Sequence, residues 1–194
     1  MKKILYLLVL VTLTGYAQIN EEHLKIGDNA PTILGIDQFG NRINSDIILQ
    51  HNKILLLFYR GNWCPYCRRH LKALSENLEQ LTKKGYQVLV VTPENIEKTK
   101  ETSTLFEVNY SIIHDTDNKI MNEYLVAFDV NKQNVTNFYK FTLNKIKKYN
   151  EPDNAVLPVP ATYVINQNGK IAFVHYDPDY KKRASFETIL NLSD

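Results

Sequence analysis

Cysteine is scarce in this chain of 194 residues, which has only Cys64 and Cys67, separated by two residues. A disulfide between them would close so short a loop that it would remove almost no chain entropy from the unfolded state. A structural staple is therefore a poor explanation of the pair. A reactive dithiol explains this spacing better.

An excess of charge of one sign is also lacking. The formal net charge is +2, from 23 basic and 21 acidic side chains, and Lys2 and Lys3 account for the whole excess. Nucleic-acid surfaces and polybasic membrane contacts need a clustered positive field, which this balance does not supply. We therefore expect a protein or a small molecule as partner, and no nucleic acid.

Long hydrophobic runs are confined to the N-terminus. A basic start is followed by an apolar run over residues 4–13, and Gly15 and Ala17 are the small residues that precede a signal-peptide cleavage site. A run of this length is too short to cross about 30 Å of hydrocarbon, so we expect no stable membrane anchor. We predict a signal peptide over residues 1–17, a single domain over residues 18–194, and an exported protein, periplasmic or extracellular.

The hydrophobic pattern of the remaining chain predicts an α/β fold. Residues 53–59 are nearly all Ile, Leu and Phe, which is typical of a strand buried on both faces. Leucines at helical spacing follow Pro65, and an apolar strand over residues 86–92 completes one βαβ unit with a right-handed crossover. The other expected elements are a hairpin over 32–45, a helix over 93–108, a strand over 110–114, a helix over 117–128, a helical insertion over 131–150, an irregular stretch over 151–160, paired strands over 161–166 and 171–175, and a helix over 184–192.

The dithiol lies where the first strand of this unit meets its helix. Pro65 suits the first helical position, because its missing N–H would have no partner there. Cys64 is then expected at the start of the helix, where unpaired amides and the helix dipole stabilise a thiolate. Cys67 is expected one turn further along the same side. We predict that Cys64 attacks a disulfide and that Cys67 resolves the intermediate.

Several neighbours of the dithiol are candidates for supporting roles. Arg60 and Arg68 would favour the thiolate if they point toward it, although each could equally be solvated surface charge. Trp63 would present a flat apolar wall to a substrate peptide, with core packing as its alternative role. Pro65 and Tyr66 are included with Trp63 in the predicted substrate-binding surface.

These residues give the chain a resemblance to the thioredoxin superfamily and, more narrowly, to its peroxiredoxin-like branch, the alkyl hydroperoxide reductase/thiol-specific antioxidant (AhpC/TSA) family. The matching segments are Gly27–Pro31, Phe58–Cys67, Val91–Glu94 and Val159–Asn166 with Gly169. The resemblance implies a thioredoxin-like fold, with a central mixed sheet flanked by helices, an N-terminal hairpin and the insertion around 131–150. It also implies that Val159–Pro160 is a cis peptide that faces the dithiol and helps to bind an extended substrate.

The chain departs from the peroxiredoxin pattern at the residues that activate peroxide. In typical peroxiredoxins a Pro, a Thr or Ser and the peroxidatic Cys form a fixed run, and an Arg precedes a late strand. Here Arg60 replaces that Pro, Cys64 replaces the Thr, Cys67 falls at the peroxidatic position and Pro160 replaces the late Arg. We therefore favour thiol–disulfide exchange, with a thiol-dependent peroxidase as the alternative.

A further alternative is non-enzymatic handling of a soft metal such as copper, with the two thiols and His70, His114 or His175 as ligands. No third Cys accompanies them, and the spacing favours redox work, so we predict no metal site. The expected redox centre is the Cys64–Cys67 pair itself, with no other cofactor. Its expected partners are a thiol or disulfide substrate and a thiol protein that donates or accepts electrons.

Two carboxylates are candidates for an acid that assists Cys67. They are Glu94, after the second predicted strand, and Asp115, after the third.

Overall fold

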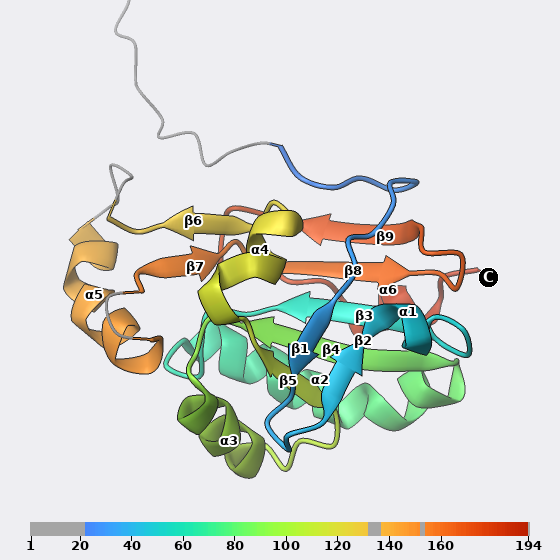
Figure 1. Ribbon diagram of the computed structural model, residues 1–194, viewed down its shortest axis with the longest axis horizontal. Coiled ribbons are helices and arrows are strands. Elements are labelled where there is room, and N and C mark those ends of the chain that lie inside the picture. The colour runs from blue at the N-terminus through green and yellow to red at the C-terminus, as the bar shows by residue number, and fades with distance from the viewer. Residues whose placement is uncertain (1–21, 132–136, 152–153, 194) are drawn as a thin grey trace, which may run out of the picture.

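The computed structural model describes residues 22–131, 137–151 and 154–193 (Figure 1). The predicted signal peptide lies outside the described residues. Within those ranges no helix is long and apolar enough to cross a membrane.

A five-stranded mixed sheet forms the centre of the fold, as predicted (Figure 1). Its strands run in the order β5 (Ser111–His114), β4 (Tyr86–Thr92), β3 (Lys53–Phe58), β8 (Ala161–Ile165) and β9 (Ile171–Tyr176). β3 is parallel to β4, and β4 is parallel to β5, whereas β8 is antiparallel to both β3 and β9. The strand predicted to be buried on both faces is therefore the central strand of the sheet.

Each face of the central sheet carries a hydrophobic core, because successive side chains of a strand point to opposite faces. Leu55 and Leu57 of β3 pack on the face covered by α2 (Pro65–Lys83) and α6 (Phe186–Leu190). Ile54 and Leu56 pack on the other face. That second face carries α4 (Lys119–Glu123), α1 (Ser45–Ile48) and the hairpin of β1 (Leu34–Ile36) and β2 (Arg42–Asn44) (Figure 1).

The sequence of α2 explains both its start and its orientation. Pro65 occupies the beginning of the helix and Cys64 is its N-cap residue. Leu71, Leu74 and Leu81 form its buried stripe, which holds the helix against the sheet. The register of this stripe also places the buried Cys67 on the core side, one turn inside the helix.

The predicted helix over residues 117–128 is wrong in its second half. A 3-10 turn, η1 (Thr116–Asn118), precedes α4, and Leu125 then adopts φ 57°, which ends the helical conformation. The chain continues as β6 (Ala127–Asp129), which pairs antiparallel with β7 (Val156–Pro158). β7 lies in the stretch expected to be irregular, so that expectation is wrong for residues 156–158.

The helices predicted over residues 93–108 and 184–192 are shorter than expected. α3 (Ile96–Leu105) begins only after Asn95, whose side chain accepts a hydrogen bond from the Lys98 N–H at 3.0 Å and caps the helix. The predicted insertion contains α5 (Asn137–Tyr149).

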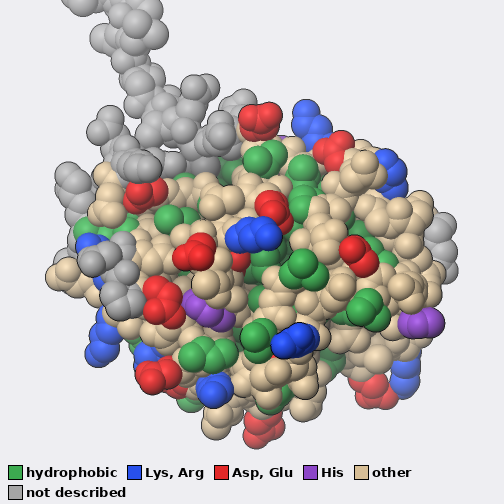
Figure 2. Space-filling model, in the orientation of Figure 1, with side chains coloured by type: hydrophobic (Ala, Val, Ile, Leu, Met, Phe, Trp, Pro, Cys, Tyr) green, Lys and Arg blue, Asp and Glu red, His purple; other side chains and the backbone are tan. Residues whose placement is uncertain are grey.

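On the face that carries β1 and α4, acidic and basic side chains are interspersed (Figure 2).

Candidate active site

The loop between β3 and α2 holds the dithiol in a defined conformation. Gly61 has φ 139°, and a Cβ atom there would lie 2.4 Å from Trp63 Nε1, so the position requires glycine. The Cys64 N–H donates to the Gly61 carbonyl at 3.1 Å. This turn delivers Cys64 to the first turn of α2, as the sequence predicts.

Cys64 carries the more acidic thiol of the pair. Its side chain is only 1% exposed, and Arg60 Nη2 lies 3.2 Å from its Sγ atom. A hydrogen bond from the Cys67 thiol is the largest cause that lowers the pKa of Cys64, and the charge of Arg60 also lowers it. Burial opposes both, and the pKa settles at about 5. The N–H of Cys67 makes the smallest contribution, so the helix amides stressed by the sequence argument matter less than these two side chains.

Cys67 carries the less acidic thiol of the pair. Burial raises its pKa well above the usual range, and the neighbouring Cys64 raises it further. The side chain is 1% exposed, and Arg183 Nη2 lies 3.7 Å from its Sγ atom. Both cysteines are free in this structure. At neutral pH the site therefore pairs a thiolate at Cys64 with a protonated thiol at Cys67.

Arg60 is buried beside Cys64, whereas Arg68 is exposed on the surface of α2. The guanidinium of Arg60 is buried, and it lies 5.4 Å from the ring of Trp63 and 4.1 Å from the ring of Tyr180. These two aromatic contacts position the charge beside Cys64. Arg68 is exposed and lines an open groove on α2 together with Pro65.

The predicted substrate-binding residues lie on two sides of the dithiol. Tyr66 lies at the beginning of α2, where its ring makes an edge contact with Tyr180 at 5.6 Å. Trp63 packs against the cluster that contains Val159, so these two segments do meet. The predicted cis peptide before Pro160 is wrong, because that bond is trans. The Val159 N–H donates to the Val126 carbonyl at 2.8 Å, and the extended chain runs directly from β7 to β8.

Of the two candidate acids, only Glu94 lies beside the dithiol loop. Its carboxylate accepts a hydrogen bond from the Tyr59 hydroxyl at 2.5 Å and from the Asn62 N–H at 2.9 Å. Burial raises the pKa of Glu94 to about 7, although both hydrogen bonds oppose the rise. Glu94 therefore ties the end of β3 and the active-site loop to the end of β4.

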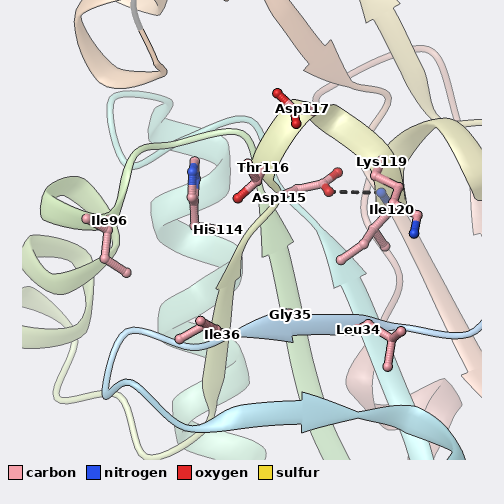
Figure 3. Close-up of a pocket in the computed structure, with 10 residues that line it drawn as sticks. All are labelled: Leu34, Gly35, Ile36, Ile96, His114, Asp115, Thr116, Asp117, Lys119 and Ile120. Atoms are coloured by element: carbon pink, nitrogen blue, oxygen red, sulfur yellow. Dashed lines mark hydrogen bonds between the residues drawn. The ribbon is translucent and has the colours of Figure 1, made fainter.

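Asp115 serves a different part of the molecule. Its carboxylate accepts hydrogen bonds from the N–H groups of Ile120 and Met121, each at 2.8 Å, and so caps α4. It lines a separate hollow of about 470 Å³, between β1 and the segment after β5 (Figure 3). Its carboxylate points toward Ile120 in that view.

His70 and His114, two of the histidines considered as metal ligands, make other contacts in the fold. His70 is stacked on Phe186 at 4.9 Å, and burial together with the charge of Arg183 lowers its pKa to about 3. His114 lies elsewhere, with Nδ1 at 2.6 Å from the Glu94 carbonyl. In the parts of the chain that the structure describes, no three His, Cys, Asp or Glu side chains are grouped so that they could hold a metal ion.

Replacing Glu94 by Gln tests the burial of this acid. The pKa of Glu94 is raised from its ordinary value of 4.5 to about 7, so between these values the folded state binds a proton that the unfolded state releases. Ionised Glu94 therefore costs the fold stability as the pH rises through this window. Relative to wild type, Glu94→Gln is expected to gain up to about 3 kcal/mol between pH 4.5 and pH 7, measured by urea unfolding.

The comparison is a difference at each pH, so the titration of other groups cancels. Glu97→Gln, an exposed change on α3, is the matched control and should show no such trend. Parallel stability curves for wild type and Glu94→Gln would show that Glu94 has an ordinary pKa in the fold.

Tyr180 and Arg183 are the site residues that the sequence argument missed. They lie more than a hundred residues after the dithiol, in a polar stretch between β9 and α6. No local pattern marks them, because their role depends on how the end of β9 is placed beside α2. The antiparallel pairing of β8 with β9 holds one end of this stretch, and the packing of α6 against α2 holds the other.

Comparisons with known proteins agree with this geometry. The model of the AhpC/TSA family matches residues 26–174. The thiol-disulfide oxidoreductase ResA of Bacillus subtilis is 24% identical over 178 residues, which are 87% of this chain and 79% of the relative. Peroxiredoxin Bcp of Escherichia coli K12 is 28% identical over 101 residues, which are 52% of this chain and 64% of the relative.

Solved structures support the predicted fold. The peroxidoxin BcpB of Mycobacterium tuberculosis superposes with a TM-score of 0.63 at 15% identity, covering 79% of this chain and 86% of that chain. The thioredoxin domain of a thiol-disulfide oxidoreductase from Bacteroides vulgatus superposes with a TM-score of 0.58 at 17% identity, covering 86% and 96%. The thioredoxin-like fold is confirmed, and the chain belongs to the AhpC/TSA family as a thiol-dependent oxidoreductase.

Proposed function

We propose that the protein catalyses thiol–disulfide exchange through Cys64 and Cys67. The observation that carries the proposal is the inequality of the two thiols. The pKa of Cys64 is lowered to about 5, whereas the pKa of Cys67 is raised. A thiolate is the attacking form of cysteine, so Cys64 is the nucleophile at neutral pH. Cys67 remains protonated until it attacks the mixed disulfide in the second exchange.

The reaction proceeds in two exchanges. The Cys64 thiolate attacks one sulfur of the substrate disulfide, forming a mixed disulfide and releasing the other sulfur as a thiolate that takes up a proton. Cys67 then loses its proton and attacks Cys64 Sγ, which releases the second substrate thiol. The substrate gains two electrons, and the protein is left with a Cys64–Cys67 disulfide.

The pair needs no other cofactor under this proposal, because the two sulfurs hold both electrons. The substrate is a disulfide of a protein or a small molecule. A thiol protein returns the oxidised pair to the dithiol, or accepts electrons from it if the reaction runs in the opposite direction. Direction depends on the reduction potential of the pair against that of its partner.

A thiol-dependent peroxidase is the second candidate, favoured by the similarity to peroxiredoxin Bcp. In that reaction the Cys64 thiolate would attack a hydroperoxide, so that an S–O bond forms, the O–O bond breaks and water or an alcohol leaves. The Cys67 thiol would condense with the resulting sulfenic acid to give a disulfide and water. The protonated Cys67 is a poor first nucleophile compared with the Cys64 thiolate, which favours Cys64 for this step also.

Export of the protein is part of the proposal. It rests on the basic start, the apolar run over residues 4–13 and the small residues before position 18. An oxidising compartment outside the cytoplasm suits a protein that exchanges disulfides.

Side-by-side assays of the reduced wild-type protein test the choice between the two activities. Thiol–disulfide exchange predicts catalytic reduction of insulin or 2-hydroxyethyl disulfide at rates far above those of free dithiothreitol. It also predicts hydrogen peroxide consumption close to that of an unactivated thiol. Rapid peroxide consumption with no disulfide reduction would replace the proposal by its peroxidase alternative.

A further inference from the structure

Cys64, the nucleophile of the proposed reaction, is almost completely shielded from solvent. Cys64 is only 1% exposed, although its sulfur must meet a substrate sulfur directly. A small disulfide needs a narrow path to that atom, whereas a disulfide on a folded protein needs an open surface around it. The residues that cover Cys64 therefore bear on which substrates can react.

One segment outside the βαβ unit contacts residues beside both cysteines. Residues 177–183, which we call the strap, connect β9 to α6. The Tyr180 ring lies 4.1 Å from the guanidinium carbon of Arg60, the residue that contacts Cys64. Three residues later, Arg183 Nη2 lies 3.7 Å from Cys67 Sγ.

The strap is attached to the active site through side chains. Tyr180 contacts Arg60 by its face and Tyr66 by an edge contact at 5.6 Å. Within the strap, the Lys182 N–H donates to the Asp179 carbonyl at 2.9 Å. Lys182 Nζ also pairs with the Asp177 carboxylate at 3.0 Å. Displacing Tyr180 breaks its contacts with Arg60 and Tyr66, whereas the pairing of β8 with β9 ends at Tyr176, before the strap begins.

We propose that Tyr180 determines the size of the substrate that reaches Cys64. With the ring seated on Arg60 and Tyr66, the site reacts with small thiols, disulfides or hydroperoxides. A disulfide carried on a folded protein reacts only after the strap moves away. This inference rests on the proposed role of Cys64 as nucleophile, and it makes small molecules the preferred substrate class of the closed site.

Two maleimides of different size measure this access with the same chemistry. The reporter is the full chain carrying Cys67→Ser, in which Cys64 is the only thiol. N-ethylmaleimide is the small probe, and a maleimide joined to a long polyethylene glycol chain is the large probe. The ratio of their rate constants cancels the thiolate fraction, because both probes react with the same thiolate.

Adding Tyr180→Ala is expected to raise the rate of the large probe by about ten-fold, the factor expected from losing one aromatic and one cation–π contact. The ratio of the large-probe rate to the small-probe rate is the quantity that should rise, because any change in the thiolate fraction through Arg60 affects both probes equally. Tyr180→Phe, which keeps the ring, is the matched control and should retain the ratio of the parent. Tyr180→Leu keeps apolar volume without a ring and should resemble the alanine variant, which guards against misfolding of the latter.

An unchanged ratio of rates in both the Ala and the Leu variants, with wild-type thermal unfolding, would overturn the inference. That result would leave the proposed function standing, because Cys64 would still be the reacting thiol. Failure of the proposed function has a different signature, namely disulfide turnover that survives Cys64→Ser. The two failures are therefore distinguishable.

Discussion

Cys64→Ser is expected to abolish turnover, whereas Cys67→Ser is expected to stop the reaction after its first step. Serine at position 64 supplies no thiolate, and Cys67, whose pKa is raised, is too weakly acidic to replace it at neutral pH. Serine at position 67 leaves Cys64 able to attack but removes the thiol that releases the product. Intact-protein mass spectrometry should then find Cys67→Ser carrying one half of the substrate disulfide.

The hydroxyl of Cys67→Ser makes it a better test than an alanine variant. The largest cause of the low pKa of Cys64 is the hydrogen bond from the side chain at position 67, which a hydroxyl can still donate. The first attack should therefore retain its rate while turnover fails. Turnover by both single variants at the wild-type rate would refute the assignment of this pair.

The part of the site formed by β3, the following turn and α2 could be predicted from sequence, because its sequence signals lie in one continuous segment. The apolar run of β3, Pro65 at the start of α2 and the leucines that follow fix the strand, the turn and the buried face of the helix. Together they place Cys64 at the N-cap and Cys67 on the core side. The pattern of residues 161–176 likewise predicts the antiparallel pair β8 and β9.

The parts that sequence reasoning missed depend on contacts between distant segments. β6 and β7 have three residues each and pair across the α5 insertion, so neither carries enough periodicity to be identified alone. The order of importance among the causes that lower the pKa of Cys64 also needed coordinates. The helix start was evident from Pro65, but the burial of Arg60 and its contact with Tyr180 were not.

Replacing Arg60 is expected to have a large effect on how the reactivity of Cys64 depends on pH. Arg60→Met removes a buried positive charge that lies 3.2 Å from the sulfur while keeping a long side chain against Trp63. An opposite charge at this range lowers a pKa by about one to three pH units, so the pKa of Cys64 should rise from about 5 toward 7. Alkylation by iodoacetamide at pH 5 should slow by about five- to fifty-fold, because the rate follows the thiolate fraction.

The sign of the effect makes the result specific. Loss of a positive charge disfavours the thiolate, so the deficit of Arg60→Met is largest at low pH and disappears as the pH passes the new pKa. Arg68→Met removes a neighbouring positive charge that is exposed to solvent, and its profile should match that of wild type. A uniform loss of rate at every pH would point to a collapsed active-site loop. An unshifted profile would leave the hydrogen bonds from the thiol and the N–H of Cys67 as the causes of the acidity of Cys64.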